Sequence, residues 1–321
     1  MVKICVSGAI NWDINLFVDR FPEIGEEIPV NRITRVPGGK AANVAVASAR
    51  ILGPDEVALI GCLGRDDIAR QQIEILKGEG VVVSGIKIDD ESESGQAYII
   101  IDRNGRNIIN TFFGANLKLA PNDIYAPHIF SLIRESSILV LIDPPLETIE
   151  CLSKTAKSLS KTVMWDAGVR STLGLERLKE VLRNINYLVV NEVEVKNLTG
   201  EHNPEKAWDR LSEINGDMSL IVKLGSRGCM LIDQRRIIMV PGVDLKEMGL
   251  KVVNTVGCGD AFLGVFAAYK VLGLSDLEAL EMANLAGALK ATKAETRGSP
   301  SRENLEKYIP YKKAGIFIRG E

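Results

Sequence analysis

A glycine-rich turn at residues 257–259, followed at once by Asp260, has the composition of an active site. An apolar extended run that ends at Val252-Val253 precedes it, and residues 260–272 carry apolar side chains at helical spacing. The glycines are therefore expected at a helix N-terminus, where unpaired backbone N–H groups can bind an anion. Two roles for Asp260 are open: a helix cap, or a general base acting on a hydroxyl that attacks a bound phosphoryl group.

Two further polar clusters are suited to binding hydroxyl groups. Asn11 and Asp13 follow a short apolar run and share a face if the chain stays extended, although an Asx turn would also explain them. Lys40 and Asn43 follow a Gly38-Gly39 bend at the start of a small-residue segment, residues 40–52. A solvated lysine and an internal cap are the simpler explanation of that second pair.

Two segments carry a resemblance to the ribokinase or pfkB family of carbohydrate kinases. Residues 254–262, NTVGCGDAF, resemble its C-terminal signature D-T-x-G-A-G-D-x-F, and residues 37–43, PGGKAAN, resemble its N-terminal signature. Shorter similar stretches are GAINWD, GAN, NEVE and GSRG, at residues 8–13, 114–116, 191–194 and 225–228. The resemblance covers nearly the whole chain and is more specific to the family than to the substrate.

The resemblance implies a kinase that transfers phosphate from ATP, with Mg²⁺, to a primary hydroxyl of a sugar. D-ribose is the first choice of substrate, a nucleoside is the second, and a fructose-type sugar is the third. A sugar or nucleotide sensor without catalysis on the same fold stays as an alternative, since a fold does not determine a function. An NAD-dependent oxidoreductase is disfavoured because the first βα turn lacks a G-x-G-x-x-G pattern.

The resemblance also implies a role for individual residues. Asp260 would be the base, and the phosphoryl group would lie against Gly257, the Cys258 backbone and Gly259. The expected sugar ligands are Asn11, Asp13, Gly39, Lys40, Asn43, Asp143 and Asp260. The expected nucleotide ligands are Asn191, Lys223, Gly225, Gly228, Gly259 and Asn284, with residues 294–300 closing the other side of the adenine. Glu194 would hold Mg²⁺ through water.

The chain departs from the family pattern at four positions. Asp143 stands where ribokinases have a glutamate, Lys223 where a threonine is common, and Cys258 where alanine is usual. Asn254 replaces the aspartate of a monovalent-cation site that usually holds potassium. A neutral amide lacks the charge that offsets the dehydration of the ion, so potassium should bind weakly or be dispensed with. Backbone carbonyls of residues 294–300 could instead hold the ion unaided.

Alternating strands and helices are expected to position these residues. Continuous apolar strands are expected at residues 3–9, 57–63, 137–142, 162–166, 187–190 and 219–222. Helices are expected at residues 40–52, 67–79, 147–160, 175–184, 192–198 and 277–292. This order predicts an α/β fold with a doubly wound, mostly parallel sheet flanked by helices, whose ligands bind beyond the carboxyl ends of the strands.

Residues 14–36 and 94–114 do not fit that rhythm. They are punctuated by Pro, Gly and an Asn-Gly hairpin signal, which indicates strands joined by turns. The resemblance implies one kinase domain over residues 1–321 in which these two segments form a small β lid over the sugar. The lid of one subunit often pairs with the lid of another, so a homodimer is expected.

Composition excludes several other classes of function. The net charge of −3 gives no general attraction to nucleic acid or to anionic membranes. No apolar run reaches the roughly 18 residues of a membrane span, and residues 1–10 look like a strand, not a signal peptide. Five dispersed cysteines and two distant histidines argue against zinc, haem and disulfides, and for the cytoplasm. Walker A and protein-kinase motifs are absent from the sequence.

Overall fold

The computed structural model describes residues 1–319, in which ten strands form one large sheet. The strand order is β14-β13-β12-β11-β10-β9-β8-β1-β4-β5. The strands are β1 (Ile4–Gly8), β4 (Val57–Gly64), β5 (Val81–Asp89), β8 (Ile138–Ile142), β9 (Thr162–Asp166), β10 (Tyr187–Asn191), β11 (Ser219–Lys223), β12 (Gly228–Ile232), β13 (Ile237–Pro241) and β14 (Ile316–Arg319). Pairing is parallel from β5 to β11 and antiparallel from β11 to β14.

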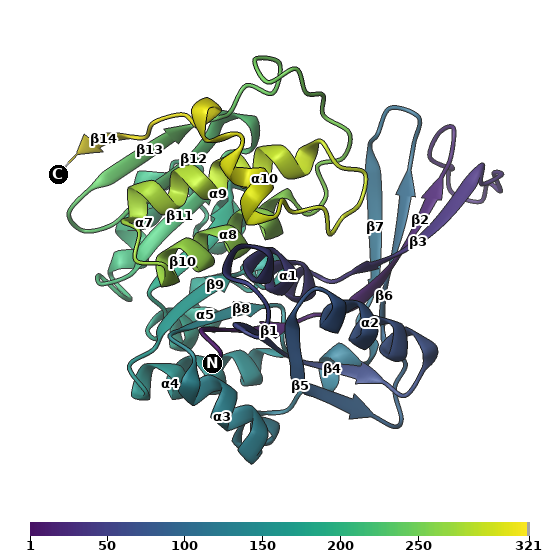
Figure 1. Ribbon diagram of the computed structural model, residues 1–321, viewed down its shortest axis with the longest axis horizontal. Coiled ribbons are helices and arrows are strands. Elements are labelled where there is room, and N and C mark those ends of the chain that lie inside the picture. Colours follow the sequence, from purple (N-terminus) through teal and green to yellow (C-terminus); the bar gives the residue numbers. More distant parts are fainter. Residues whose placement is uncertain (320–321) are drawn as a thin grey trace.

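Helices cover both faces of this sheet (Figure 1). One face carries α1 (Lys40–Leu52), α2 (Asp67–Gly78), α8 (Cys258–Val271), α9 (Asp276–Ala291) and α10 (Arg302–Glu306). The other face carries α3 (Pro127–Glu135), α4 (Leu146–Ser158), α5 (Gly174–Leu182), α6 (Glu192–Thr199) and α7 (Pro204–Ser212). Alternate residues of β8 point to the two faces. Ile138 and Val140 belong to the hydrophobic core under α1 and α8, and Leu139 and Leu141 belong to the core under α3 and α4. The predicted doubly wound sheet is confirmed.

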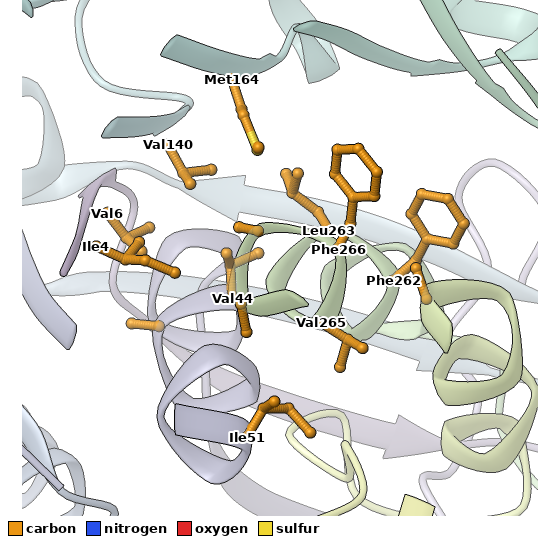
Figure 2. Packing of buried hydrophobic residues seen from close by; sticks show 14 of the residues in the cluster. Ile4, Val6, Val44, Ile51, Val140, Met164, Phe262, Leu263, Val265 and Phe266 are labelled. Atoms are coloured by element: carbon orange, nitrogen blue, oxygen red, sulfur yellow. The ribbon is translucent and has the colours of Figure 1, made fainter. Parts of the chain in front are cut away.

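A close contact between α1 and α8 sets the position of the glycine turn. A Cβ at Gly264 would lie 2.6 Å from the Ala47 Cβ, so only glycine allows this approach. Figure 2 shows Leu263 and Phe266 of α8 pointing toward Val140 and Met164 of the sheet. Burial of each such apolar side chain stabilises the folded protein by roughly 1.5–3 kcal/mol. The N-termini of both helices are thereby held together.

A second sheet of four strands projects from one edge of the molecule (Figure 1). It contains β2 (Asn11–Phe17), β3 (Arg32–Gly38), β6 (Gly95–Ile101) and β7 (Asn107–Phe112), in the order β3-β2-β6-β7. β6 and β7 form the hairpin expected from the Asn-Gly signal, with Gly105 at a φ of 78°. Because β2 begins at Asn11 and β3 ends at Gly38, this sheet joins the large one beside both polar clusters.

Three local expectations were wrong or incomplete. Val252 and Val253 belong to no strand and are 62% and 60% exposed, because their segment bonds to the end of α9 instead of to a sheet. Helix α8 begins at Cys258, two residues early, because Gly257 adopts a φ of 86° and starts the helix directly. Strands β5, β13 and β14 were not predicted. Within residues 1–319, every helix is too short or too polar to cross a membrane.

Candidate active site

The carboxyl ends of four neighbouring parallel strands bring charged and polar residues to one edge of the sheet. Asp166 ends β9, Asn191 ends β10, Lys223 ends β11, and Asp143 directly follows β8. The chain turns sharply at Asp143, which has a φ of 57°. Neighbouring parallel strands end at the same edge of the sheet. Because β8, β9, β10 and β11 are adjacent in the sheet in this order, the residues at their carboxyl ends lie side by side.

Asp260 lies in the first turn of α8 and does not cap it. Its Oδ2 accepts a hydrogen bond of 2.8 Å from the Asn43 Nδ2, and no side chain caps this helix at Gly257. Burial raises the pKa of Asp260, which the charge of Lys40 and the Asn43 hydrogen bond partly oppose. The carboxylate is thus held beside the Gly38-Gly39 bend, with its other oxygen available for a hydroxyl.

The start of α8 offers backbone N–H groups to an anion, although not all that were expected. The Cys258 N–H donates to the Thr255 carbonyl at 3.2 Å, so it is already used inside the turn. The N–H groups of Gly259 and Asp260 make no backbone hydrogen bond to the rest of residues 1–319. Burial raises the pKa of the Cys258 thiol, which makes a thiolate nucleophile there unfavourable.

The Gly38-Gly39 bend wraps closely around Asn11 and Asp13. A Cβ at Gly38 would lie 2.1 Å from the Asp13 Oδ1, and a Cβ at Gly39 would lie 2.4 Å from the Asn11 nitrogen. The Asn11 Oδ1 accepts from the Asn116 Nδ2 at 2.8 Å, which orients the Asn11 amide. The two polar clusters identified in the sequence therefore lie against each other and form one polar wall.

Arg297 completes this wall and was not predicted. It is 6% exposed, and it donates to the Gly38 carbonyl at 2.8 Å and to the Asn43 Oδ1 at 3.2 Å. Burial lowers the pKa of Arg297 to about 10. Burial likewise raises the pKa of Asp13 to about 7, and the Arg297 charge opposes that rise. No sequence signal distinguished Arg297, because its loop was assigned to the nucleotide side.

Lys40 bridges two carboxylates at the strand ends. Its Nζ is 3.7 Å from the Asp143 Oδ2 and 3.8 Å from the Asp166 Oδ1. Burial disfavours its charge, but Asp166 and Asp143 outweigh this and raise the pKa of Lys40. The buried Asp143 Oδ1 has no hydrogen-bond partner among the described residues. A buried acceptor without a partner is therefore left at this strand end.

A cavity of about 320 Å³ lies on the other side of the glycine turn. Lys223, Gly225, Gly228, Gly259 and Asn284 line it, as expected for a nucleotide pocket. Gly242, Val243, Leu245 and Val252 also line it, whereas none of residues 294–300, all of them described, lines it. That loop instead packs against the glycine turn, since a Cβ at Gly257 would lie 2.3 Å from the Thr296 carbonyl oxygen.

Asn191 and Glu194 form a reciprocal cap at the start of α6. The Asn191 N–H donates to the Glu194 Oε2 at 2.9 Å, and the Glu194 N–H donates to the Asn191 Oδ1 at 2.9 Å. Asn191 is not part of the cavity wall. Burial raises the pKa of Glu194, and the charge of Asp166 adds to the rise. A cation bound nearby would stabilise the ionised form of Glu194. The Glu194 oxygen that is not used in the cap could bind such a cation.

Lys223 forms a buried ion pair with Asp166, with the Nζ 2.7 Å from the Oδ2. A Cβ at Gly259 would lie 3.3 Å from the same ammonium, so Lys223 lies beside the glycine turn. The positive charge of Lys223, together with that of Lys40, lowers the pKa of Asp166 against the effect of burial. Lys223 thus places a positive charge between the strand ends and the start of α8.

Replacing Lys223 with methionine should destabilise the fold by about 3 kcal/mol, because the Asp166 carboxylate stays buried without its closest partner. Calorimetric unfolding would measure this loss. In the double variant Lys223→Met with Asp166→Asn most of the loss should disappear, whereas Arg70→Met, which breaks an exposed pair with Asp67, should change little. Additive effects of the two substitutions would show that the pair carries no coupling.

Comparison with known proteins shows similarity over nearly the whole chain. Residues 1–303 match the family described as pfkB family carbohydrate kinase. The ATP-dependent ribose-1-phosphate kinase of Halopiger xanaduensis is 29% identical over 96% of this chain and 98% of its own length. The ribokinase of Lactococcus lactis is 30% identical over 93% of both chains. The structure of Arabidopsis thaliana ribokinase complexed with ribose and ATP superposes with a TM-score of 0.83 at 28% identity, over 96% and 98% of the two chains.

Proposed function

Because the chain belongs to the pfkB family of carbohydrate kinases, we propose that it transfers the γ-phosphoryl group of ATP to the primary hydroxyl of a pentose. D-ribose, giving ribose 5-phosphate, is the first choice. The observation that carries this proposal is the 2.8 Å hydrogen bond between Asn43 and Asp260. This bond connects Asn43, in the group of polar side chains suited to binding hydroxyls, with Asp260, which directly follows the glycine turn suited to binding a phosphoryl group.

The proposed mechanism assigns proton removal to Asp260. Asn11, Asp13 and Asn43 hold the sugar hydroxyls, so that the primary hydroxyl lies between the Asp260 carboxylate and the start of α8. The carboxylate accepts the hydroxyl proton while the oxygen attacks the γ-phosphorus of ATP, and the bond from that phosphorus to the bridging oxygen of ADP breaks, so that ADP leaves. The N–H groups of Gly259 and Asp260 and the Lys223 ammonium stabilise the negative charge on the transferring group.

Magnesium is implied by ATP, and the residues at the strand ends fit a water-held ion. Within residues 1–319 no group of three or more His, Cys, Asp and Glu side chains converges on one metal position. A Mg²⁺ bound mainly through waters and phosphate oxygens needs only one or two carboxylates, and Glu194 can supply one. Such an ion neutralises charge on the phosphates of ATP.

A second substrate, ribose 1-phosphate, is favoured by the cations around Asp143. Lys40 is 3.7 Å from Asp143, and the positive charge of Arg170 also opposes the rise in the pKa of this carboxyl that burial causes. The buried Arg170 Nε has no hydrogen-bond partner among the described residues. Asp143 is one methylene shorter than the glutamate of ribokinases, which leaves space for a substituent on the sugar. A phosphate on that side of the pentose could bind both cations.

One kinetic screen tests these assignments. ADP release would be measured with ATP and each of ribose, ribose 1-phosphate, cytidine, adenosine and fructose, at equal concentrations. We expect one of the two pentoses to have the highest kcat/KM. A nucleoside or fructose in first place would replace the assigned substrate, and no ADP release above that of Asp260→Asn with any acceptor would favour a sensor without catalysis.

The small sheet is proposed to pair with the same sheet of a second subunit. Ile33, Ile108 and the intervening Leu16 and Ile100 form one row across it, and Phe112 lies on the same face. Ile33, Ile108 and Phe112 are 45%, 45% and 47% exposed. Apolar side chains on an uncovered face favour association with a partner.

Introducing a charge into that row should therefore produce monomers. Ile108→Lys is expected to halve the mass measured by light scattering after size exclusion, because burial of the new ammonium in the interface is unfavourable. Ile309→Lys changes an isoleucine of similar exposure, 40%, outside the small sheet and serves as the control. A wild-type protein that is monomeric at micromolar concentration would contradict this assignment.

A further inference from the structure

A fully buried lysine lies behind the anion-binding turn. Lys290 is on α9, its exposed fraction is 0%, and its Nζ donates to the Asn254 carbonyl oxygen at 2.9 Å. No carboxylate within residues 1–319 lies within ion-pair distance of it. Burial lowers the pKa of Lys290, and the nearby charges of Asp260 and Glu295 oppose this only in part. A buried ammonium without a paired carboxylate is costly, so its presence calls for an explanation.

Asn254 is the position at which the family resemblance places a monovalent-cation ligand, and its surroundings do not fit such an ion. The Asn254 Oδ1 accepts from the Val256 N–H at 3.0 Å, and the Asn254 Nδ2 donates to the Ala294 carbonyl at 2.8 Å. The Asn254 carbonyl oxygen accepts from Lys290. These three oxygens are thus satisfied by the chain itself, and the carboxylate that would offset the ion's dehydration is missing.

We propose that the Lys290 ammonium takes the place of the monovalent cation and holds residues 254–257 in the conformation from which α8 starts. Lys290 is thus a positioning residue. It acts through the Asn254 carbonyl and the turn, and it touches neither the sugar nor the phosphates. The inference rests on the proposed function, because it concerns the anion-binding turn of that same site.

The contacts around the turn are consistent with one positive charge, the Lys290 ammonium, held in place by α9. Hydrogen bonds from the Val253 and Asn254 N–H groups to the Ala291 carbonyl, at 2.8 and 3.1 Å, fasten the segment to the end of α9, one residue beyond Lys290. The Thr296 carbonyl closes the other side of Gly257. An ammonium held by a four-carbon stem already fixed in α9 costs less ordering entropy than the capture of a free ion from solution.

The first measurement uses the wild-type chain and needs no variant. Binding of a non-hydrolysable ATP analogue with Mg²⁺ would be followed by calorimetry in potassium chloride and in tetramethylammonium chloride at equal ionic strength. We expect the two dissociation constants to agree within about twofold, and kcat to be equally insensitive once an acceptor is known. A many-fold stimulation of binding by millimolar potassium would overturn the proposal.

Two variants of Lys290 separate the charge from the side-chain volume. Lys290→Ala leaves a space beside the Asn254 carbonyl, and Lys290→Met fills it with an apolar chain. In tetramethylammonium we expect both to bind the analogue about ten- to a hundredfold more weakly, because small displacements of an anion-binding turn have effects of this size. Potassium or ammonium should restore much of the affinity of Lys290→Ala and little of that of Lys290→Met.

Lys270→Met is the matched control. Lys270 also lies on a helix, donates to a carbonyl oxygen at 3.0 Å and is largely buried, but it is at the opposite end of α8 and pairs with Asp276. This variant should lose stability without changing the response of nucleotide binding to potassium. In the double variant Lys290→Ala with Asn254→Asp, potassium should restore more of the affinity for the ATP analogue than in Lys290→Ala alone, because the aspartate supplies the negative charge that offsets dehydration of the ion.

Two results with the variants would overturn the proposal: full affinity of Lys290→Ala in tetramethylammonium, or a loss that neither potassium nor ammonium reverses. The second result would assign Lys290 a structural role only. If Lys290→Ala fails to fold, the wild-type comparison still decides, because potassium dependence of the intact chain contradicts a built-in cation. The binding experiment contains no sugar, so failure of every acceptor in the kinetic screen would reject the proposed function without affecting this result.

Discussion

Replacing Asp260 with asparagine is expected to lower kcat by about 10²–10⁴-fold, the usual effect of removing a general base. The amide keeps the shape and the hydrogen bond to Asn43, but it cannot accept the hydroxyl proton. Sugar affinity should change much less, because Asn11 and Asp13 still hold the hydroxyl groups. Steady-state kinetics with saturating ATP and calorimetric titration of the sugar would separate the two effects.

A control for this variant is Asp67→Asn, which changes an exposed aspartate in the first turn of α2. That substitution alters the charge at a helix start without touching the site, so kcat should stay at the wild-type value. Burial raises the pKa of Asp260, so the wild-type rate should begin to fall at a higher pH than for an ordinary aspartate as the solution is acidified. A near wild-type rate for Asp260→Asn would refute the assignment of the base.

Replacing Asp13 with alanine is expected to weaken sugar binding by about ten- to a hundredfold or more, because a hydrogen bond to a charged group contributes roughly 1.5–3 kcal/mol. Asp13 is 5% exposed, and the Gly38 backbone packs directly against its carboxylate. Binding of the ATP analogue should be unchanged, since the nucleotide cavity lies on the other side of the glycine turn. Calorimetry with ribose and with the analogue would measure both affinities.

The pH dependence of sugar binding provides an independent test of Asp13. Its pKa is raised to about 7 by burial, and the carboxylate accepts hydrogen bonds on both oxygens more strongly than the protonated acid, which must donate from one of them. Sugar affinity should therefore increase as the pH rises from about 6 to about 8, and Asp13→Asn should remove most of this increase. Unchanged ribose affinity in Asp13→Ala, or the same pH profile in Asp13→Asn, would exclude Asp13 from the sugar site.

The sequence by itself determined many of the local elements and the class of chemistry. Helix α1 was predicted over residues 40–52, which are its observed bounds, because a glycine flanks each end and small helix-forming residues fill the interior. Strand β9 was likewise predicted at its observed bounds, residues 162–166. Such features depend on residues a few positions apart, so local propensity and periodicity are enough to predict them.

Only the tertiary structure decided which of these residues act together. Asn43 and Asp260 are 217 positions apart in the sequence, and Asn43 and Arg297 are 254 apart, yet each pair is hydrogen-bonded. The same holds for the contact of Asp260 with Asn43 in place of a helix-capping bond, which depended on the close approach of α1 and α8 at Gly264.

The buried charges gave the least sequence signal. Lys290 and Arg297 look in the sequence like ordinary surface cations, and the Ala294 to Pro300 loop, which was expected beside the adenine, does not line the cavity next to the glycine turn. Whether a charge is buried depends on how helices and strands pack around it, because desolvation and the positions of opposite charges are set by distant parts of the chain. A pattern read along the sequence contains the charge but not its surroundings, and the surroundings determine what that charge does.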